Sequence, residues 1–93
     1  MAMALGFAWF SARTYLRLRE ISADKGNLPE TFQEWEKRAQ AQFDGLTAKG
    51  IAVEKVLIEP DALLNWANDS PIDSKKRADF AAIILMKKHE AGH

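Results

Sequence analysis

The chain carries closely spaced carboxylates, the side chains from which general acid–base catalysis is most often built. Three such pairs occur: Glu34 with Glu36, Glu59 with Asp61, and Asp69 with Asp73. Each pair also has a structural interpretation. Glu34 completes a capping box that starts at Thr31, Glu59 and Asp61 flank Pro60 where a short helix is expected to begin, and Asp73 is expected to cap the last helix. Negative charge is favourable at a helix N-terminus, so we interpret these carboxylates as helix-terminus residues rather than as catalytic groups.

Other common catalytic arrangements are missing from the sequence. There is no cysteine, which removes disulfides, thiolate nucleophiles, iron–sulfur clusters and cysteine-based zinc sites. The two histidines, His89 and His93, both lie near the C-terminus, so a Ser-His-Asp triad cannot be assembled with them. No glycine-rich phosphate loop, HExxH motif or EF-hand loop occurs. The sequence therefore predicts no enzyme, no metal site and no cofactor.

Three consecutive basic residues, Lys75, Lys76 and Arg77, lie where the last helix is expected to begin, and a second basic group, Arg13, Arg17 and Arg19, reads as surface. A short helix and a turn precede residues 75–77, which gives a loose helix-turn-helix outline, and a recognition helix presents its N-terminal residues to the major groove. However, Lys75 and Asp79 form an i,i+4 pair of opposite charge, which is typical of a solvated helix face. The whole chain has 13 basic and 13 acidic residues and so has no overall field that attracts nucleic acid. Nucleic-acid binding is therefore the alternative prediction.

The N-terminal segment from Met3 to Phe10 alternates in side-chain size, which is typical of a β-strand. One face carries large side chains that look suited to a core, among them Leu5, Phe7 and Trp9. The other face is mostly small and would let another element approach closely at Gly6. At about ten apolar residues the segment is too short to cross a membrane. The basic residues that follow it are in the wrong order for an export signal, so we expect a cytoplasmic protein without a membrane contact.

The remaining elements follow from caps and periodicity. A helix is predicted over residues 12–22, and a longer amphipathic helix runs from Thr31 to a left-handed C-cap at Gly50. Residues 51–58 read as a second strand. Pro60 suits the first turn of a short helix, and the last helix runs from Asp73 or Ser74 toward Glu90.

This order predicts a single α+β domain over residues 1–93 with the topology β-α-α-β-α-α. If every short connection reverses the chain, the two strands form an antiparallel pair, with the four helices on one face. Two strands alone are marginal in water, and the first one carries almost no charge to protect its edge. We therefore expect a homodimer, formed by pairing of strand edges into a four-stranded sheet or by stacking of sheet faces. Coverage of the N-terminal strand by its own helices is the other possibility.

The residues predicted for a dimer interface are Leu5, Phe7 and Trp9. Trp9 is the strongest of these because tryptophan buries a large area and is a frequent interface anchor. The leading functional prediction is a small non-enzymatic protein-interaction module that self-associates and has room for a further, unidentified protein partner. The alternative is a nucleic-acid-binding regulator that uses Lys75, Lys76 and Arg77.

Three stretches of sequence also resemble a family. They are residues 28–35 (LPETFQEW), residues 58–66 (IEPDALLNW) and residues 78–81 (ADFA). Together they resemble a group of small uncharacterised bacterial proteins of similar length. No activity is assigned to that group, so the resemblance implies a single small domain and no catalytic or binding residue.

Overall fold

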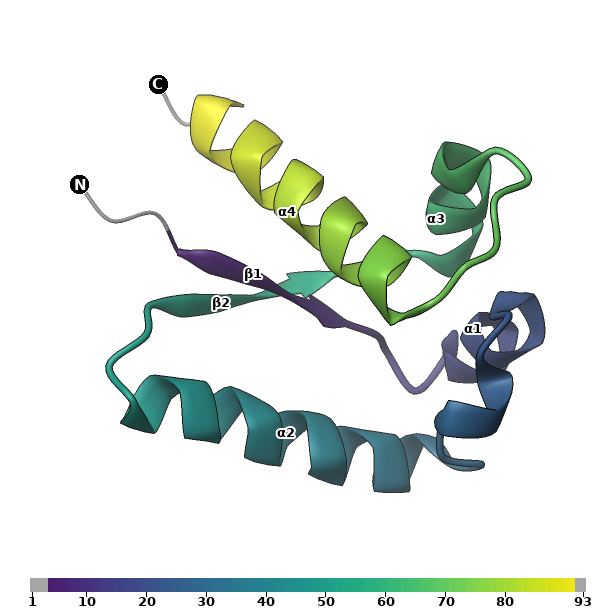
Figure 1. The fold of residues 1–93 in the computed structure, drawn as a ribbon, viewed down its shortest axis with the longest axis horizontal. Coiled ribbons are helices and arrows are strands. Elements are labelled where there is room, and N and C mark those ends of the chain that lie inside the picture. The colour runs from purple at the N-terminus through teal and green to yellow at the C-terminus, as the bar shows by residue number, and fades with distance from the viewer. Residues whose placement is uncertain (1–3, 92–93) are drawn as a thin grey trace.

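The computed structural model describes residues 4–91, and its elements follow the predicted order β-α-α-β-α-α (Figure 1). The chain forms an α+β fold with four helices and a two-stranded sheet. In chain order the elements are β1 (Leu5–Trp9), α1 (Tyr15–Ile21), the short 3-10 helix η1 (Lys25–Asn27), α2 (Phe32–Ala48), β2 (Val53–Leu57), α3 (Pro60–Ala67) and α4 (Ser74–Ala91).

The two strands run parallel, so the prediction of an antiparallel pair was wrong. Leu5 lies opposite Val53, and the register continues to Trp9 opposite Leu57. The reason is the unequal length of the two helices between the strands. With seven residues, α1 is only about 10 Å long and turns the chain at the end of β1. The 17-residue α2 alone travels back along the sheet, so β2 starts again in the direction of β1.

Helices cover both faces of the sheet, not one as predicted (Figure 1). The large side chains of β1 face α2, since the Phe7 ring centroid lies 5.9 Å from that of Phe43. The opposite face meets α4, where a Cβ atom at Gly6 would lie 3.0 Å from the carbonyl oxygen of Ala81. The small-residue face of β1 is thus the one that α4 approaches most closely.

The helix ends follow the local sequence signals. The Thr31 hydroxyl accepts a hydrogen bond from the backbone N–H of Glu34 at 3.2 Å and caps α2. Gly50 takes the left-handed conformation just after that helix, with φ of 82°. Asn68 adopts the same region and ends α3. The Asp73 carboxylate accepts from the N–H of Lys76 at 3.0 Å at the start of α4.

The largest fully buried side chains lie where the carboxyl ends of the strands meet α1 and α3. They are Phe10, Tyr15, Leu18, Ile58, Pro60, Leu63 and Ile72. The Tyr15 hydroxyl donates to the carbonyl oxygen of Pro29 at 2.6 Å, which satisfies its only polar group inside the core. At the opposite end of β1 the packing is thinner, and Leu5 is 50% exposed.

Candidate interaction groove along the free edge of strand β1

Among the residues that the structure describes, strand β1 is hydrogen-bonded to another strand along one edge only. The Leu5 N–H donates to the Ala52 carbonyl oxygen at 2.8 Å, and the Ile58 N–H donates to the Trp9 carbonyl oxygen at 2.9 Å. Backbone groups alternate in direction along a strand, so Gly6 and Ala8 direct their N–H and C=O groups away from β2. Within residues 4–91 the sheet has two strands, and no third strand pairs with these groups.

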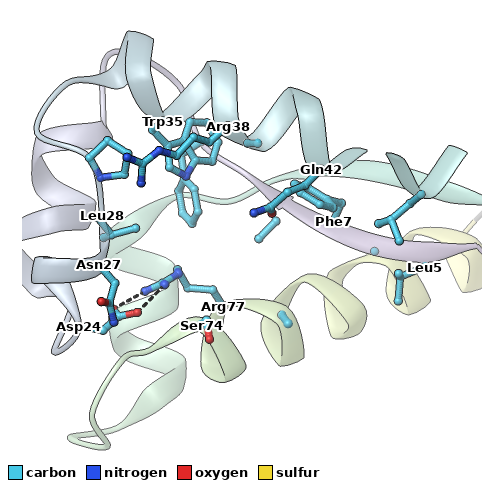
Figure 2. A pocket seen from close by; sticks show the side chains of 17 residues that line it. Leu5, Phe7, Asp24, Asn27, Leu28, Trp35, Arg38, Gln42, Ser74 and Arg77 are labelled. Carbon is cyan, nitrogen blue, oxygen red and sulfur yellow. Dashed lines mark hydrogen bonds and ion pairs between the residues drawn. The ribbon is translucent and has the colours of Figure 1, made fainter. Parts of the chain in front are cut away.

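A groove of about 530 Å³ lies along this free edge. Figure 2 shows its two walls: Trp35, Arg38 and Gln42 project from α2, while Ser74 and Arg77 project from α4. Residues Leu5 to Ala8 of β1 line the groove between these walls. The groove therefore offers unpaired backbone donors and acceptors between two helical walls, which is the requirement for adding an extended segment as a strand.

One end of the groove is closed by a charged pair (Figure 2). Arg77 donates to both carboxylate oxygens of Asp24 at 2.8 Å. Only 10% of the Arg77 side chain and 16% of the Asp24 side chain are exposed. The hydrogen bonds from Arg77 hold the pKa of Asp24 below its ordinary value, against the opposing effect of burial. A third contact runs from Arg77 to the Ser22 hydroxyl at 3.4 Å.

The residues predicted for an interface are divided between the groove and the interior. Trp9 packs edge-on against Trp35 with 5.0 Å between ring centroids, and Phe7 packs in the same manner against Phe43. Both are half-buried, whereas Leu5 is half-exposed at the open end. Sequence reasoning missed Gly6 and Ala8 as edge residues. Side-chain alternation identifies the two faces of a strand, but only its pairing register identifies which backbone groups stay free.

The three basic residues of the alternative prediction do not form a common surface. Lys75 bonds Asp79 at 3.0 Å, as the i,i+4 spacing predicted. The ammonium group of Lys76 lies 5.6 Å from the centre of the Trp66 ring. Arg77 is buried in its contact with Asp24. The structure thus separates the cluster that looked continuous in sequence.

Some carboxylates outside the groove form ion pairs on the surface. Lys88 bonds Glu54 at 2.6 Å and lowers the pKa of Glu54, and the His89 Nε2 lies 3.6 Å from the same carboxylate. Arg17 bonds Asp61 at 2.9 Å on the surface. Among the residues that the structure describes, no three histidine, cysteine or acidic side chains come close enough to hold a metal ion. His93 lies outside the described residues.

No helix between residues 4 and 91 has the length and apolar character needed to span a bilayer.

No protein-family model, no curated protein and no solved structure matches the chain. The resemblance of residues 28–35, 58–66 and 78–81 to small bacterial proteins stays a prediction.

Proposed function

We propose that the protein is a non-enzymatic interaction module that self-associates by pairing the free edges of β1 from two copies. The observation that carries this proposal is the groove along the β1 edge, where the outward backbone groups of Gly6 and Ala8 have no strand partner within residues 4–91. Strand addition satisfies such groups with main-chain hydrogen bonds. The product would be a two-fold dimer with one continuous four-stranded sheet, in the strand order β2-β1-β1-β2.

The two outer edges of the sheet differ in their suitability for this pairing. By the same alternation, Val53, Lys55 and Leu57 direct their backbone groups to the outer edge of β2. Lys55 is exposed on that strand, and a lysine on an edge strand discourages pairing with another chain. Residues 5–9 of β1 carry no charge. The β1 edge is therefore the better candidate for association.

The helices favour edge pairing over stacking of sheet faces. Because α2 and α4 lie on opposite faces of the sheet, neither face is bare (Figure 1). Four strands spaced by about 4.8 Å make a sheet about 19 Å wide, and two helices packed at about 10 Å cover that width. Each copy brings two strands and one helix for each face, which is half of such a sandwich.

The side of α4 that borders the groove also suits a close neighbour. Ala78 lines the groove and is exposed, and Ala82 follows one helical turn later and is exposed as well. Small side chains permit short distances between helix axes. The formal net charge of zero adds no repulsion between copies.

The test is the mass in solution, measured by light scattering over a dilution series. Two proline variants distinguish the edges, because proline removes one backbone N–H and is tolerated at the free edge of a strand. Ala8→Pro removes an outward N–H from β1, and Leu57→Pro removes the matching group from β2. We expect a dimer for the wild type and for Leu57→Pro, and a folded monomer for Ala8→Pro.

Far-UV circular dichroism checks that both variants keep their helices. A wild type that remains monomeric at the highest concentration would contradict the proposal, as would an Ala8→Pro variant that dimerises like the wild type.

The nucleic-acid alternative has no specific observation in its favour, since Arg77 is held by Asp24. It predicts a salt-sensitive shift of DNA mobility that charge reversal of Lys75 and Lys76 abolishes.

A further inference from the structure

Resting on the proposed function, we infer that the two β1 strands pair antiparallel about a two-fold axis that passes between the two copies of Phe7. In this register Gly6 lies opposite Ala8 of the partner subunit, and Leu5 lies opposite Trp9 of the partner subunit. The inference specifies which residues meet, whereas self-association alone requires only that the β1 edges pair.

The direction of the free backbone groups limits the possible registers. In an antiparallel pair, two opposite residues that exchange both hydrogen bonds alternate with two that exchange none. In β1 the free groups belong to Gly6 and Ala8, while those of Leu5, Phe7 and Trp9 are used by β2. Even-numbered residues must therefore meet even-numbered residues, so the axis passes beside a residue and not between two. An axis beside residue 6, 7 or 8 pairs three or more residues of each strand.

Strand length selects among these three registers. β1 runs from Leu5 to Trp9, with Phe7 at its centre. An axis beside Phe7 pairs all five residues of both strands. Moving the axis to residue 6 or 8 pairs only three residues of the strand and leaves two at one end unmatched. The central register therefore satisfies the most backbone groups, and unpaired backbone groups are costly when they become buried.

The side chains on the face toward α2 favour the same register. Leu5 is half-exposed in the monomer, although its strand neighbours on this face are half-buried. With the axis beside Phe7, Leu5 lies across from Trp9 of the partner subunit, and the two phenylalanines face each other. Aromatic and aliphatic cross-strand pairs of this kind stabilise sheets. The exposed Leu5 of one copy is thus covered by Trp9 of the partner subunit.

On the face toward α4 there is room only for small side chains, and this register places small side chains there. A Cβ atom at position 6 would lie 3.0 Å from the Ala81 carbonyl oxygen, so α4 lies almost against the strand. Opposing Gly6 with Ala8 of the partner subunit places the two smallest side chains of β1 together under the two α4 helices. A register that moved Phe10 into this layer opposite Gly6 would add bulk where the helices approach.

Single cysteines test the register cleanly, because the chain has no cysteine of its own. A cysteine links to its own copy only when the axis passes beside it. The two Phe7 positions would form a pair without hydrogen bonds, with Cα atoms about 4.5 Å apart, which a disulfide can span at about 4.4–6.8 Å. We expect Phe7→Cys to form a disulfide dimer under mild oxidation, whereas Leu5→Cys, Ala8→Cys and Trp9→Cys alone form little.

A mixture of Leu5→Cys and Trp9→Cys chains, distinguished in mass by isotope labelling of one, should yield the mixed disulfide. If Ala8→Cys forms the disulfide dimer fastest, the axis lies beside residue 8. If Leu5→Cys with Phe7→Cys gives the main mixed disulfide, the axis lies beside residue 6. Either result overturns the inferred register while the dimer, seen by mass, still supports the proposed function. A wild type that stays monomeric at all concentrations defeats both.

A second measurement keeps the inference testable if the cysteine variants unfold. Isotope-filtered nuclear Overhauser effects on a mixed dimer of labelled and unlabelled wild-type chains report contacts between copies. We expect contacts from the Leu5 methyl groups of one chain to the Trp9 ring of the other. Intermolecular contacts from Leu5 to Phe7 instead, with none to Trp9, would overturn the register.

Discussion

The two faces of the sheet are closed in different ways. On one face α4 comes within van der Waals distance of the strand backbone at Gly6, and Ala81 and Leu85 of α4 are buried. On the other face, α2 is held away from the strands by aromatic rings. Phe7 and Trp9 reach across to that helix and remain half-buried.

This difference shows what each kind of side chain contributes. Small residues bring a helix and a strand together with no space between them, so the face is complete within one chain. Large residues bury more area each but leave gaps wherever a neighbour is missing. The groove lies on the side of β1 where such a neighbour is absent. The groove at the β1 edge therefore lies between the closely packed face under α4 and the more open face under α2.

The largest effect should follow from breaking the charged pair that joins the two sides at the end of the groove. Asp24→Asn leaves the Arg77 guanidinium buried beside a neutral group. Removing one partner of a buried pair costs about 3 kcal/mol of unfolding free energy. Urea denaturation should show this loss. Adding Arg77→Met to Asp24→Asn should recover part of it, and a double variant no more stable than Asp24→Asn would contradict this account.

The same pair gives a pH dependence with a defined sign. The pKa of Asp24 is lowered in the folded protein, so its stabilising contribution is complete above the ordinary value of 3.8. It is lost as the pH falls through the lowered folded pKa. The stability difference between wild type and Asp24→Asn should therefore shrink on acidification below about 4. A difference that stays constant down to the lowest measurable pH would show that the carboxylate charge is not responsible.

A smaller effect is expected from adding a side-chain atom at Gly6, on the sheet face that α4 covers. Gly6→Ala places a Cβ atom 3.0 Å from the backbone oxygen of Ala81, which cannot move without shifting α4. Such overpacking costs about 1–3 kcal/mol. Gly45→Ala is the matched control, since nothing lies within 4 Å of its added Cβ atom and it lies inside α2. That variant should gain about 0.5–1 kcal/mol. Equal melting temperatures for the two variants would mean that α4 does not constrain Gly6.

The ends of α2 and the difference between the two faces of β1 could be predicted from local sequence. Thr31 and Gly50 mark the ends of α2 because each fixes its own backbone geometry. The alternation in β1 correctly separated a large face from a small one that admits a close neighbour. These features depend on a few consecutive residues, so the sequence of one chain is enough to predict them.

The strand direction could not be obtained in the same way. The sequence predicted a helix over residues 12–22, but α1 begins at Tyr15 and is only seven residues long. Whether such a helix crosses the sheet or merely turns the chain depends on what Tyr15 and Leu18 pack against, and they pack in the central core. The groove depends on the strand direction in turn, because the pairing register decides that Gly6 and Ala8 hold the free backbone groups.

The smallest effect should come from the contact of Lys55 with the aromatic rings on the sheet face that α2 covers. The Lys55 ammonium group lies 4.0 Å from the centre of the Trp9 ring and bonds the Gln40 side-chain oxygen at 2.6 Å. A cation over an exposed aromatic ring contributes about 0.5–1 kcal/mol. Lys55→Met keeps most of the apolar stem and removes the charge, so we expect a loss of about that size in urea denaturation. Lys37→Met, on an exposed part of α2, controls for the change in net charge. If Lys55→Met is no less stable than this control, the lysine does not hold the face under α2 together, and the aromatic side chains alone account for its packing.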